Sequence, residues 1–223
     1  MTEKPTSAPD LAPAALILAG GASSRMGFPK ALLQLDGIPL VEQHLHAADA
    51  FGMTLRVVVL GYAVDTILGA ANLETAITVV NPAPHQGQFS SLQTGIETLL
   101  RPSLKDRWAA LMITPVDCPP PPSAVLRRLL SALSMEPDAD GFIPTHRGRP
   151  GHPIVLRQSC ARRLLKSSPR SRLDRVLREA NVHHIDMNAP DILWNLNTPE
   201  DVARWRRARR PAVRRKADPN PPG

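Results

Sequence analysis

Segments with the apolar character of buried β-strands alternate along this chain with segments of helical periodicity. The first five follow the order strand, helix, strand, helix, strand, over residues 14–18, 39–51, 55–60, 64–70 and 76–80. Apolar residues spaced three to four apart indicate a helix with one buried face, whereas short β-branched runs indicate buried strands. This alternation predicts a parallel sheet with helices on both faces and right-handed crossovers. The ligand site is then expected at the carboxyl ends of the strands.

The later segments continue the same architecture. We expect a helix from Ser90 or Ser91 to residue 100, a strand at 109–113, a helix capped by Ser123, strands at 139–144, 154–156 and 182–186, helices at 158–166 and 172–180, and a last helix that begins at Thr198 and Pro199. A Gly- and Pro-rich stretch, residues 140–153, predicts a small β-extension or lid over the site. The predicted fold class is a single-domain, Rossmann-like α/β fold over residues 14–205, with a mostly parallel sheet.

The net charge of +7 does not indicate a nucleic-acid partner, because the positive charge is confined to one end of the chain. From Arg204 onward there are eight basic residues and one acidic residue, and the rest of the chain carries equal numbers of each. Residues 206–223 are therefore expected to form a basic, Pro-rich, disordered tail. Residues 1–13 are expected to be disordered too, and they lack the apolar core of a signal peptide. No apolar run is long enough to span a membrane, so a cytoplasmic protein is predicted.

The first predicted strand leads directly into a loop with the composition of a phosphate-binding site. Gly20 and Gly21 expose backbone N–H groups without side-chain bulk, as a polyphosphate requires. Arg25 and Lys30 add positive charge that can bind phosphate oxygens. An ordinary turn after a strand would explain the glycines but not the two basic residues. The candidate nucleotide-binding residues here are Leu18, Ala19, Gly20, Gly21, Ser23, Ser24, Arg25 and Lys30.

A single carboxylate, Asp117, follows the fourth predicted strand and lies between Pro115 and Pro119. Mg²⁺ prefers one or two protein carboxylates together with substrate phosphates and water. The alternative interpretation is an Asp in a Pro-rich turn. The phosphate-binding loop earlier in the chain favours the metal site. The two cysteines, Cys118 and Cys160, form neither a metal-binding nor a disulfide pattern.

These segments resemble the motifs of the MobA-like nucleotidyltransferases. Residues 18–30 meet every fixed position of the family pattern L-A-(A/G)-G-x-S-x-R-M-G-x-x-K, and residues 115–119 match its P-x-D-x-P segment. Residues 195–201 resemble its (D/N)-x-(D/N)-T-P-E-D segment, which implies that Asn195 and Asn197 complete the metal site with Asp117. Both are neutral Asn in this chain, so they would add oxygen ligands but no charge.

Two further segments resemble family motifs that contact substrates. Residues 87–95 resemble the nucleotide loop G-x-x-S-S-L-x-x-G, so Ser90, Ser91 and the earlier Asn81 join the candidate nucleotide-binding residues. Residues 148–153 resemble the G-(R/K)-x-G-H-P segment of the cytidylyltransferase branch that serves the molybdenum cofactor. This implies that Arg149, Gly151 and His152 bind the acceptor, an anionic pterin phosphate.

The resemblance implies Mg²⁺-dependent transfer of a nucleotide from CTP or GTP to molybdopterin phosphate, with release of pyrophosphate. The acceptor phosphate is already anionic, so positioning and charge neutralisation by Arg25, Lys30 and Asp117 would suffice for catalysis. Gly20 and Gly21 resemble the guanylyl branch, but the two substrate segments resemble the cytidylyl branch, so CTP is favoured. The alternatives are a sugar-phosphate or isoprenoid-precursor nucleotidyltransferase, or a non-catalytic nucleotide-binding regulatory module. A molybdoenzyme or its chaperone is a further candidate partner.

Overall fold

The fold was obtained as a computed structural model that describes residues 12–209. Its strands are β1 (Pro13–Ala19), β2 (Gln34–Leu35), β3 (Ile38–Pro39), β4 (Leu55–Leu60), β5 (Ile77–Val80), β6 (Ala110–Pro115), β7 (Gly141–His146), β8 (Arg149–Pro150), β9 (Ile154–Arg157) and β10 (Val182–Asp186). Its α-helices are α1 (Leu40–Asp49), α2 (Val64–Ala70), α3 (Gln88–Leu99), α4 (Ser123–Met135), α5 (Gln158–Leu164), α6 (Leu173–Val176) and α7 (Pro199–Arg209). Short 3₁₀ helices are η1 (Lys30–Leu32), η2 (Pro84–Gln86), η3 (Leu177–Glu179) and η4 (Pro190–Leu193).

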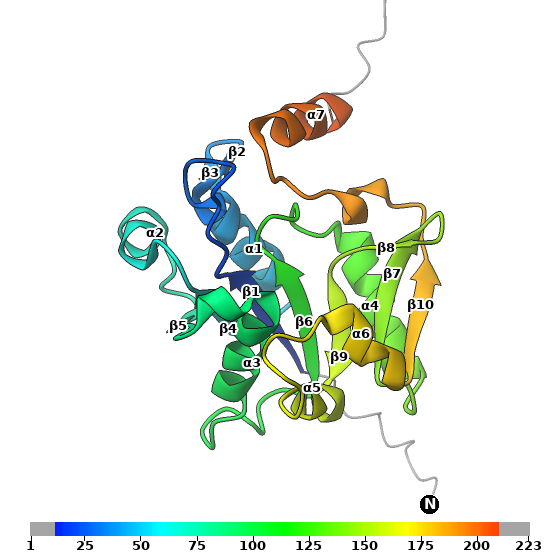
Figure 1. The fold of residues 1–223 in the computed structure, drawn as a ribbon. Coiled ribbons are helices and arrows are strands. Elements are labelled where there is room, and N and C mark those ends of the chain that lie inside the picture. The colour runs from blue at the N-terminus through cyan, green and yellow to red at the C-terminus, as the bar shows by residue number, and fades with distance from the viewer. Residues whose placement is uncertain (1–11, 210–223) are drawn as a thin grey trace, which may run out of the picture.

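The main sheet has the strand order β10-β7-β9-β6-β1-β4-β5, with β8 added to β7. Strand β1 pairs in parallel with both β4 and β6, and β5 continues the parallel set beyond β4. Strand β9 runs antiparallel to both of its neighbours, β6 and β7. The carboxyl ends of β1, β4, β5 and β6 therefore meet at one edge, and the predicted mostly parallel α/β fold is confirmed (Figure 1).

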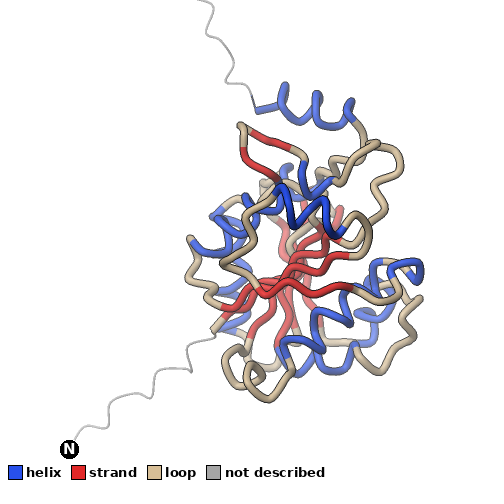
Figure 2. Tube along the Cα trace, turned by 90° about the vertical axis from the view of Figure 1, so that its left-hand side faces the viewer, coloured by secondary structure: helices blue, strands red, loops and turns tan. Residues whose placement is uncertain are grey.

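Helices cover both faces of this sheet (Figure 2). Side chains of β1 alternate between the layers: Leu16 lies in a buried cluster with residues of α3 and α5, whereas Ile17 lies in one with residues of α1 and α2. Helix α4 covers the same face as α1 farther along the sheet. Helix α3 packs so closely on β1 that a Cβ atom at Gly95 would lie 2.3 Å from the side chain of Leu16. No helix within residues 12–209 is both long and apolar enough to cross a membrane.

Two helix starts differ from the expected ones. Helix α3 begins at Gln88, after Gly87 with φ +106°, and both serines proposed as its cap are buried inside the helix. Ser123 is the first helical residue of α4, after Pro122, and its hydroxyl does not cap the helix. In both places the helix begins directly after a residue with non-helical backbone angles and has no side-chain cap.

Two short hairpins extend from the domain. Strands β2 and β3 form a separate two-stranded sheet that the sequence pattern missed. Strands β7 and β8 form the β-extension expected within residues 140–153, although β7 itself belongs to the main sheet. Each turn has two residues with positive φ, Asp36-Gly37 and Arg147-Gly148, which is the backbone of a tight hairpin.

The last helix, α7, lies beside the β2–β3 hairpin at one end of the molecule (Figure 1). Its N-terminus has a capping box, because the Thr198 hydroxyl accepts from the Asp201 N–H while the Asp201 carboxylate accepts from the Thr198 N–H. The helix continues to Arg209, so residues 206–209 are helical and do not belong to the expected tail. The remaining tail residues, 210–223, and the N-terminal residues 1–11 lie outside the described residues.

Candidate active site

The Gly-rich loop after β1 folds back on itself and places Lys30 beside Asp117 and Asn197. Ser23 has φ +53° and Gly27 has φ +71°, so the chain reverses sharply at both. The Ser23 hydroxyl accepts the backbone N–H of Lys30 at 3.0 Å, and the Ser23 carbonyl accepts that of Met26 at 2.9 Å. The Met26 side chain is buried between exposed neighbours, and it anchors the loop to the domain.

Three segments that are far apart in the sequence meet at the Lys30 ammonium. Its Nζ atom donates to Asp117 Oδ2 at 3.0 Å and to Asn197 Oδ1 at 2.5 Å. The Asp117 backbone is tied to the same region, because its carbonyl accepts the N–H of Leu196 at 2.7 Å. One carboxylate and one amide oxygen beside the Gly-rich loop offer oxygen ligands of the kind that fit Mg²⁺ or a similar divalent cation. No group of three His, Cys, Asp or Glu residues within residues 12–209 could form an all-protein metal cage.

Asn195, the other proposed metal ligand, is engaged elsewhere. Its Oδ1 atom accepts the thiol of Cys118 at 3.4 Å, and it does not line the cavities described below. Burial raises the pKa of the Cys118 thiol well above its ordinary value, so this S–H donor stays protonated. The structure therefore brings Asn197, but not Asn195, to the carboxylate of Asp117.

A cavity of about 500 Å³ lies over the Gly-rich loop and the ends of β1, β4 and β6. Among the residues proposed from the sequence, its lining includes Leu18, Ala19, Gly20, Gly21, Ser23, Arg25, Lys30, Ser91, Asp117 and Asn197. Ser24, Asn81 and Ser90 do not line it. Tyr62 and His85 do line it, and the sequence analysis missed both. They follow β4 and β5, and the shared carboxyl edge of a parallel sheet was a signal that could have found them.

Asn81 and Ser90 support the cavity wall from behind. The buried Asn81 amide donates to Ser90 Oγ at 2.8 Å and to Ser91 Oγ at 3.0 Å. Its oxygen accepts the N–H of Ala83 at 2.9 Å. Ser91 is therefore held in place beside Gly20, where an added Cβ would lie 2.7 Å from Ser91 Oγ.

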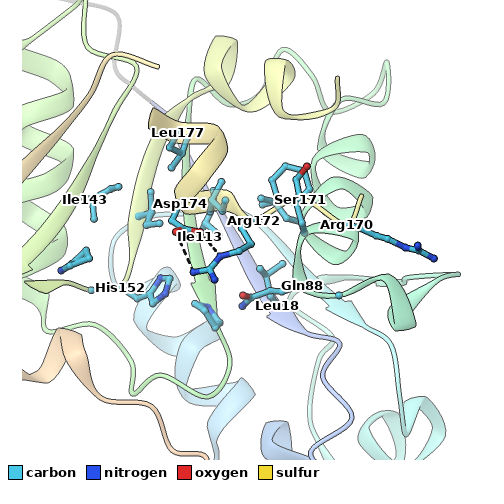
Figure 3. A pocket seen from close by; sticks show the side chains of 18 of the residues that line it. Leu18, Gln88, Ile113, Ile143, His152, Arg170, Ser171, Arg172, Asp174 and Leu177 are labelled. Carbon is cyan, nitrogen blue, oxygen red and sulfur yellow. Dashed lines mark hydrogen bonds and ion pairs between the residues drawn. The ribbon is translucent and has the colours of Figure 1, made fainter. Parts of the chain in front are cut away.

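A second cavity, of about 640 Å³, adjoins the first and shares Leu18, Gly87 and Gln88 with it. Its walls are mainly apolar, with Phe89, Leu92, Ile113, Ile143, Ile154, Leu173 and Leu177 among them. Its polar residues include His152, Arg172 and Asp174 (Figure 3). Two adjoining cavities of this size can hold two substrates side by side.

His152 presents a neutral ring to the second cavity. Burial lowers the pKa of His152, so the imidazole is uncharged near neutral pH. Its Nδ1 atom is buried and has no hydrogen-bond partner among the described residues. The backbone beside it is fixed, because the His152 N–H donates to the Ile192 carbonyl at 3.0 Å and a Cβ at Gly151 would lie 2.4 Å from that same oxygen.

The basic residues that line the second cavity are Arg170 and Arg172, and Arg149 is not among them. Arg149 is exposed in β8 and does not line either cavity. The Arg172 side chain is largely exposed, and its guanidinium lies between His152 and Gln88, whereas the Arg170 side chain extends in another direction (Figure 3). Asp174 accepts two hydrogen bonds from Arg172, at 3.0 Å and 3.3 Å.

The fold and this site define a class of enzyme. A Gly-rich loop after the first parallel strand faces Asp117 after a neighbouring strand, and a second cavity adjoins the one that they line. This is the arrangement of an α/β nucleotidyltransferase. The chain belongs to the MobA-like NTP transferase domain family, whose sequence profile matches residues 15–185. The resemblance stated from the motifs is thereby confirmed.

Individual relatives support the same family. The chain is 28% identical over 197 residues to a probable molybdenum cofactor guanylyltransferase of Nostoc sp., covering 85% of this chain and 88% of the relative. It is 24% identical over 188 residues to the molybdenum cofactor cytidylyltransferase of Escherichia coli, covering 83% and 91%. The crystal structure of Rv0371c from Mycobacterium tuberculosis has the same fold, with a TM-score of 0.72, 20% identity and coverage of 86% and 95%. A second structure of that protein, in complex with manganese, gives a TM-score of 0.66, 19% identity and coverage of 86% and 96%.

Proposed function

We propose that this nucleotidyltransferase transfers a nucleotide from CTP to the phosphate of molybdopterin and releases pyrophosphate. The observation that carries the proposal is the meeting of Lys30, Asp117 and Asn197 beside two adjoining cavities. The relatives named as molybdenum cofactor transferases support the identity of the acceptor. They also make the alternatives, another nucleotidyltransferase or a non-catalytic module, less favoured.

The first cavity would hold the triphosphate. Arg25, Lys30 and the N–H groups of the Gly-rich loop would bind its phosphate oxygens and stabilise the negative charge of the leaving pyrophosphate. Asp117 and Asn197 would hold a divalent cation, for which we favour Mg²⁺. The structure of Rv0371c in complex with manganese, which has a similar fold, is consistent with a divalent cation at this site. When bound, such a cation neutralises phosphate charge and orients the phosphates for in-line attack.

The second cavity would hold the acceptor. Its apolar walls suit a flat heterocycle, and the neutral His152 can exchange a hydrogen bond with a ring heteroatom. Arg172 would bind the acceptor phosphate in place of Arg149, because its guanidinium already lies in the cavity. The second pKa of a phosphate monoester is about 6, so the nucleophile is anionic near neutral pH and needs no general base.

The choice of CTP rests on the segments at 87–95 and 148–153, since Gly87, Ser91 and His152 all line the cavities. Gly20 remains the residue that resembles the guanylyl branch. A side chain at position 20 would meet Ser91 Oγ, so Gly20→Ala would act on the base through Ser91. We expect Gly20→Ala to shift the ratio of kcat/KM further toward CTP. We expect Gly20→Ala combined with Ser91→Ala to restore the original ratio.

Pyrophosphate release tests the proposal directly. We expect release that requires both molybdopterin and Mg²⁺ and is faster with CTP than with GTP at equal concentration. A preference for GTP of about tenfold or more, which corresponds to about 1.4 kcal/mol, would overturn the nucleotide choice. Nucleotide binding without release under any of these conditions would overturn the proposed reaction.

A further inference from the structure

His44 lies fully buried in α1, beneath the loop that carries Asp117, and the roles described above do not use it. Its Nε2 atom lies 2.9 Å from the carbonyl oxygen of Cys118, the residue after Asp117. We propose that His44 is a positioning residue, whose ring N–H holds this carbonyl and so fixes the backbone that directs the Asp117 carboxylate to its cation. The inference rests on the proposed function of Asp117.

The loop that carries Asp117 has few backbone N–H groups that could donate to the Cys118 carbonyl. The hydrogen bond from His44 is therefore important for this carbonyl. Residues 119–122 are four consecutive prolines, which have no backbone N–H. Before them, the Val116 N–H donates to the Leu18 carbonyl at 3.0 Å and the Cys118 N–H donates to the Pro115 carbonyl at 3.2 Å. The Cys118 carbonyl points inward to α1, where an unpaired buried oxygen would be costly.

The helix that carries His44 is itself firmly placed. Val41 and Leu45, on either side of His44 along the buried face, belong to one cluster with Ile17 of β1 and with Val116 of the loop. His44 therefore connects the loop to a rigid part of the core. A group supported in this way can hold a ligand in a narrow range of geometry.

The charge state of His44 suits this position. Burial lowers the pKa of His44 to about 4, although the hydrogen bond to the Cys118 carbonyl and the negative charge of Asp117 act in the opposite direction. The ring is neutral near neutral pH, so a ring that donates through Nε2–H leaves Nδ1 unprotonated. A neutral donor supports the carbonyl without placing a second positive charge beside a cation site.

The test compares donors of different reach at one position. His44→Gln places an amide N–H near the position of Nε2, His44→Asn carries the same amide on a side chain too short to reach, and His44→Met removes the donor. His46→Met, at an exposed histidine of the same helix, is the matched control. Residue-resolved amide hydrogen exchange reports on Cys118 and on Leu196, whose N–H donates to the Asp117 carbonyl. A Mn²⁺ titration in the presence of α,β-methylene CTP reports on the cation.

We expect His44→Met and His44→Asn to raise exchange at both amides by about tenfold or more. We expect them to weaken Mn²⁺ binding by about 10- to 100-fold, as loss of a supporting hydrogen bond does at metal sites. His44→Gln and His46→Met should resemble the wild type in both measurements.

Wild-type exchange in a folded His44→Met protein would overturn the inference, as would equal defects in the Gln and Asn variants. If His44→Met does not fold, the Gln and Asn variants decide between the outcomes. If the wild type does not bind Mn²⁺ with the nucleotide, the proposed function fails, while the exchange data still decide the role of His44.

Discussion

Asp117 is the only carboxylate among the described residues that line the first cavity, and Lys30 is its ion-pair partner at 3.0 Å. Both side chains are partly buried, so their charges interact more strongly than an exposed pair would. In the proposed reaction the carboxylate holds a cation and Lys30 binds phosphate oxygens. The two residues therefore have separate roles that depend on one another.

Asp117→Asn is expected to fold and to lose most of its turnover. The amide keeps the shape of the side chain but removes the charge that holds the cation, which costs several kcal/mol in the transition state; each 1.36 kcal/mol is about tenfold in rate. Steady-state kcat should fall by at least about 100-fold. Asp106→Asn, at an exposed site in a turn, is the control and should retain full activity. A kcat above about a tenth of wild type would show that Asp117 does not hold the cation.

Two histidines, the buried His44 and the half-buried His152, make the stability depend on pH. The pKa of His44 is lowered to about 4 and that of His152 is lowered too, both mainly by burial. The unfolded chain takes up protons near pH 6.5 while the folded protein does not, so the free energy of unfolding falls as pH falls from about 6.5 toward 4. Asp140, Asp174 and Asp201 have lowered pKa values, so their contributions are lost only below about pH 4.

His44→Gln should remove much of this pH dependence. The shift of His44 alone corresponds to about 3 kcal/mol between pH 7 and pH 4. Urea unfolding at several pH values should therefore give a flatter profile for the variant than for the wild type. Parallel profiles would mean that His44 is not neutral in the folded protein.

The sequence predicted some site residues and not others for a physical reason. Residues 20–30 and Asp117 directly follow neighbouring parallel strands, so the sheet alone brings them together. The position of Arg172, by contrast, depends on the contacts that fix the segment after α5. Gln93 of α3 donates to the carbonyls of Leu164 and Ser167, a contact between segments about seventy residues apart that no local pattern reveals.

At the level of elements, strands and helices with clear periodicity were predicted within a few residues of their observed ends. The β2–β3 hairpin was missed because its strands have only two residues each and carry no periodic pattern. Its signal was the turn: Asp36 and Gly37, both with positive φ, lie between Leu35 and Ile38. The cap expected at Ser90 or Ser91 was wrong because both serines are buried within α3, where the Ser90 hydroxyl donates to the Gly87 carbonyl. The cap expected at Ser123 was wrong because this exposed residue is the first helical residue of α4, so Pro122 occupies the cap position.

Helix α7 completes the candidate site from the far end of the described chain. Val202 and Trp205 pack in one cluster with Met26 of the Gly-rich loop and with Leu196, the residue between Asn195 and Asn197. The helix therefore supports the loop and Asn197 together. The sequence placed the end of the domain at residue 205, whereas α7 continues to Arg209, about one helical turn farther.

Trp205→Ala tests that support. Loss of a buried Trp side chain is expected to lower the free energy of unfolding by about 3–5 kcal/mol. Because Met26 loses a packing partner, KM for the nucleotide should rise more than KM for the acceptor. Arg207→Ala, an exposed position on the same helix, should change neither quantity. Equal changes in both KM values would argue that α7 contributes only general stability.

At the level of the whole molecule, the strand order places the two cavities next to each other. Strands β1, β4 and β6 end beneath the first cavity, and β6, β7 and β9 contribute to the second. Leu18, at the end of the central strand β1, lies in the wall of both. A nucleotide in one cavity and an acceptor in the other would have their phosphates near this shared wall, beside Asp117.

In the proposed reaction, the α-phosphate of the nucleotide is transferred to a phosphate held in the second cavity. The most direct measurement follows radioactive phosphorus from CTP labelled at the α- or the γ-position, in the presence of molybdopterin and Mg²⁺. The account predicts that α-label enters a dinucleotide product and γ-label leaves as pyrophosphate, and that Asp117→Asn abolishes both. Arg172→Ala should reduce transfer by raising KM for molybdopterin. If the α-label stays in CTP or is released as free CMP whether or not molybdopterin is present, the account is contradicted.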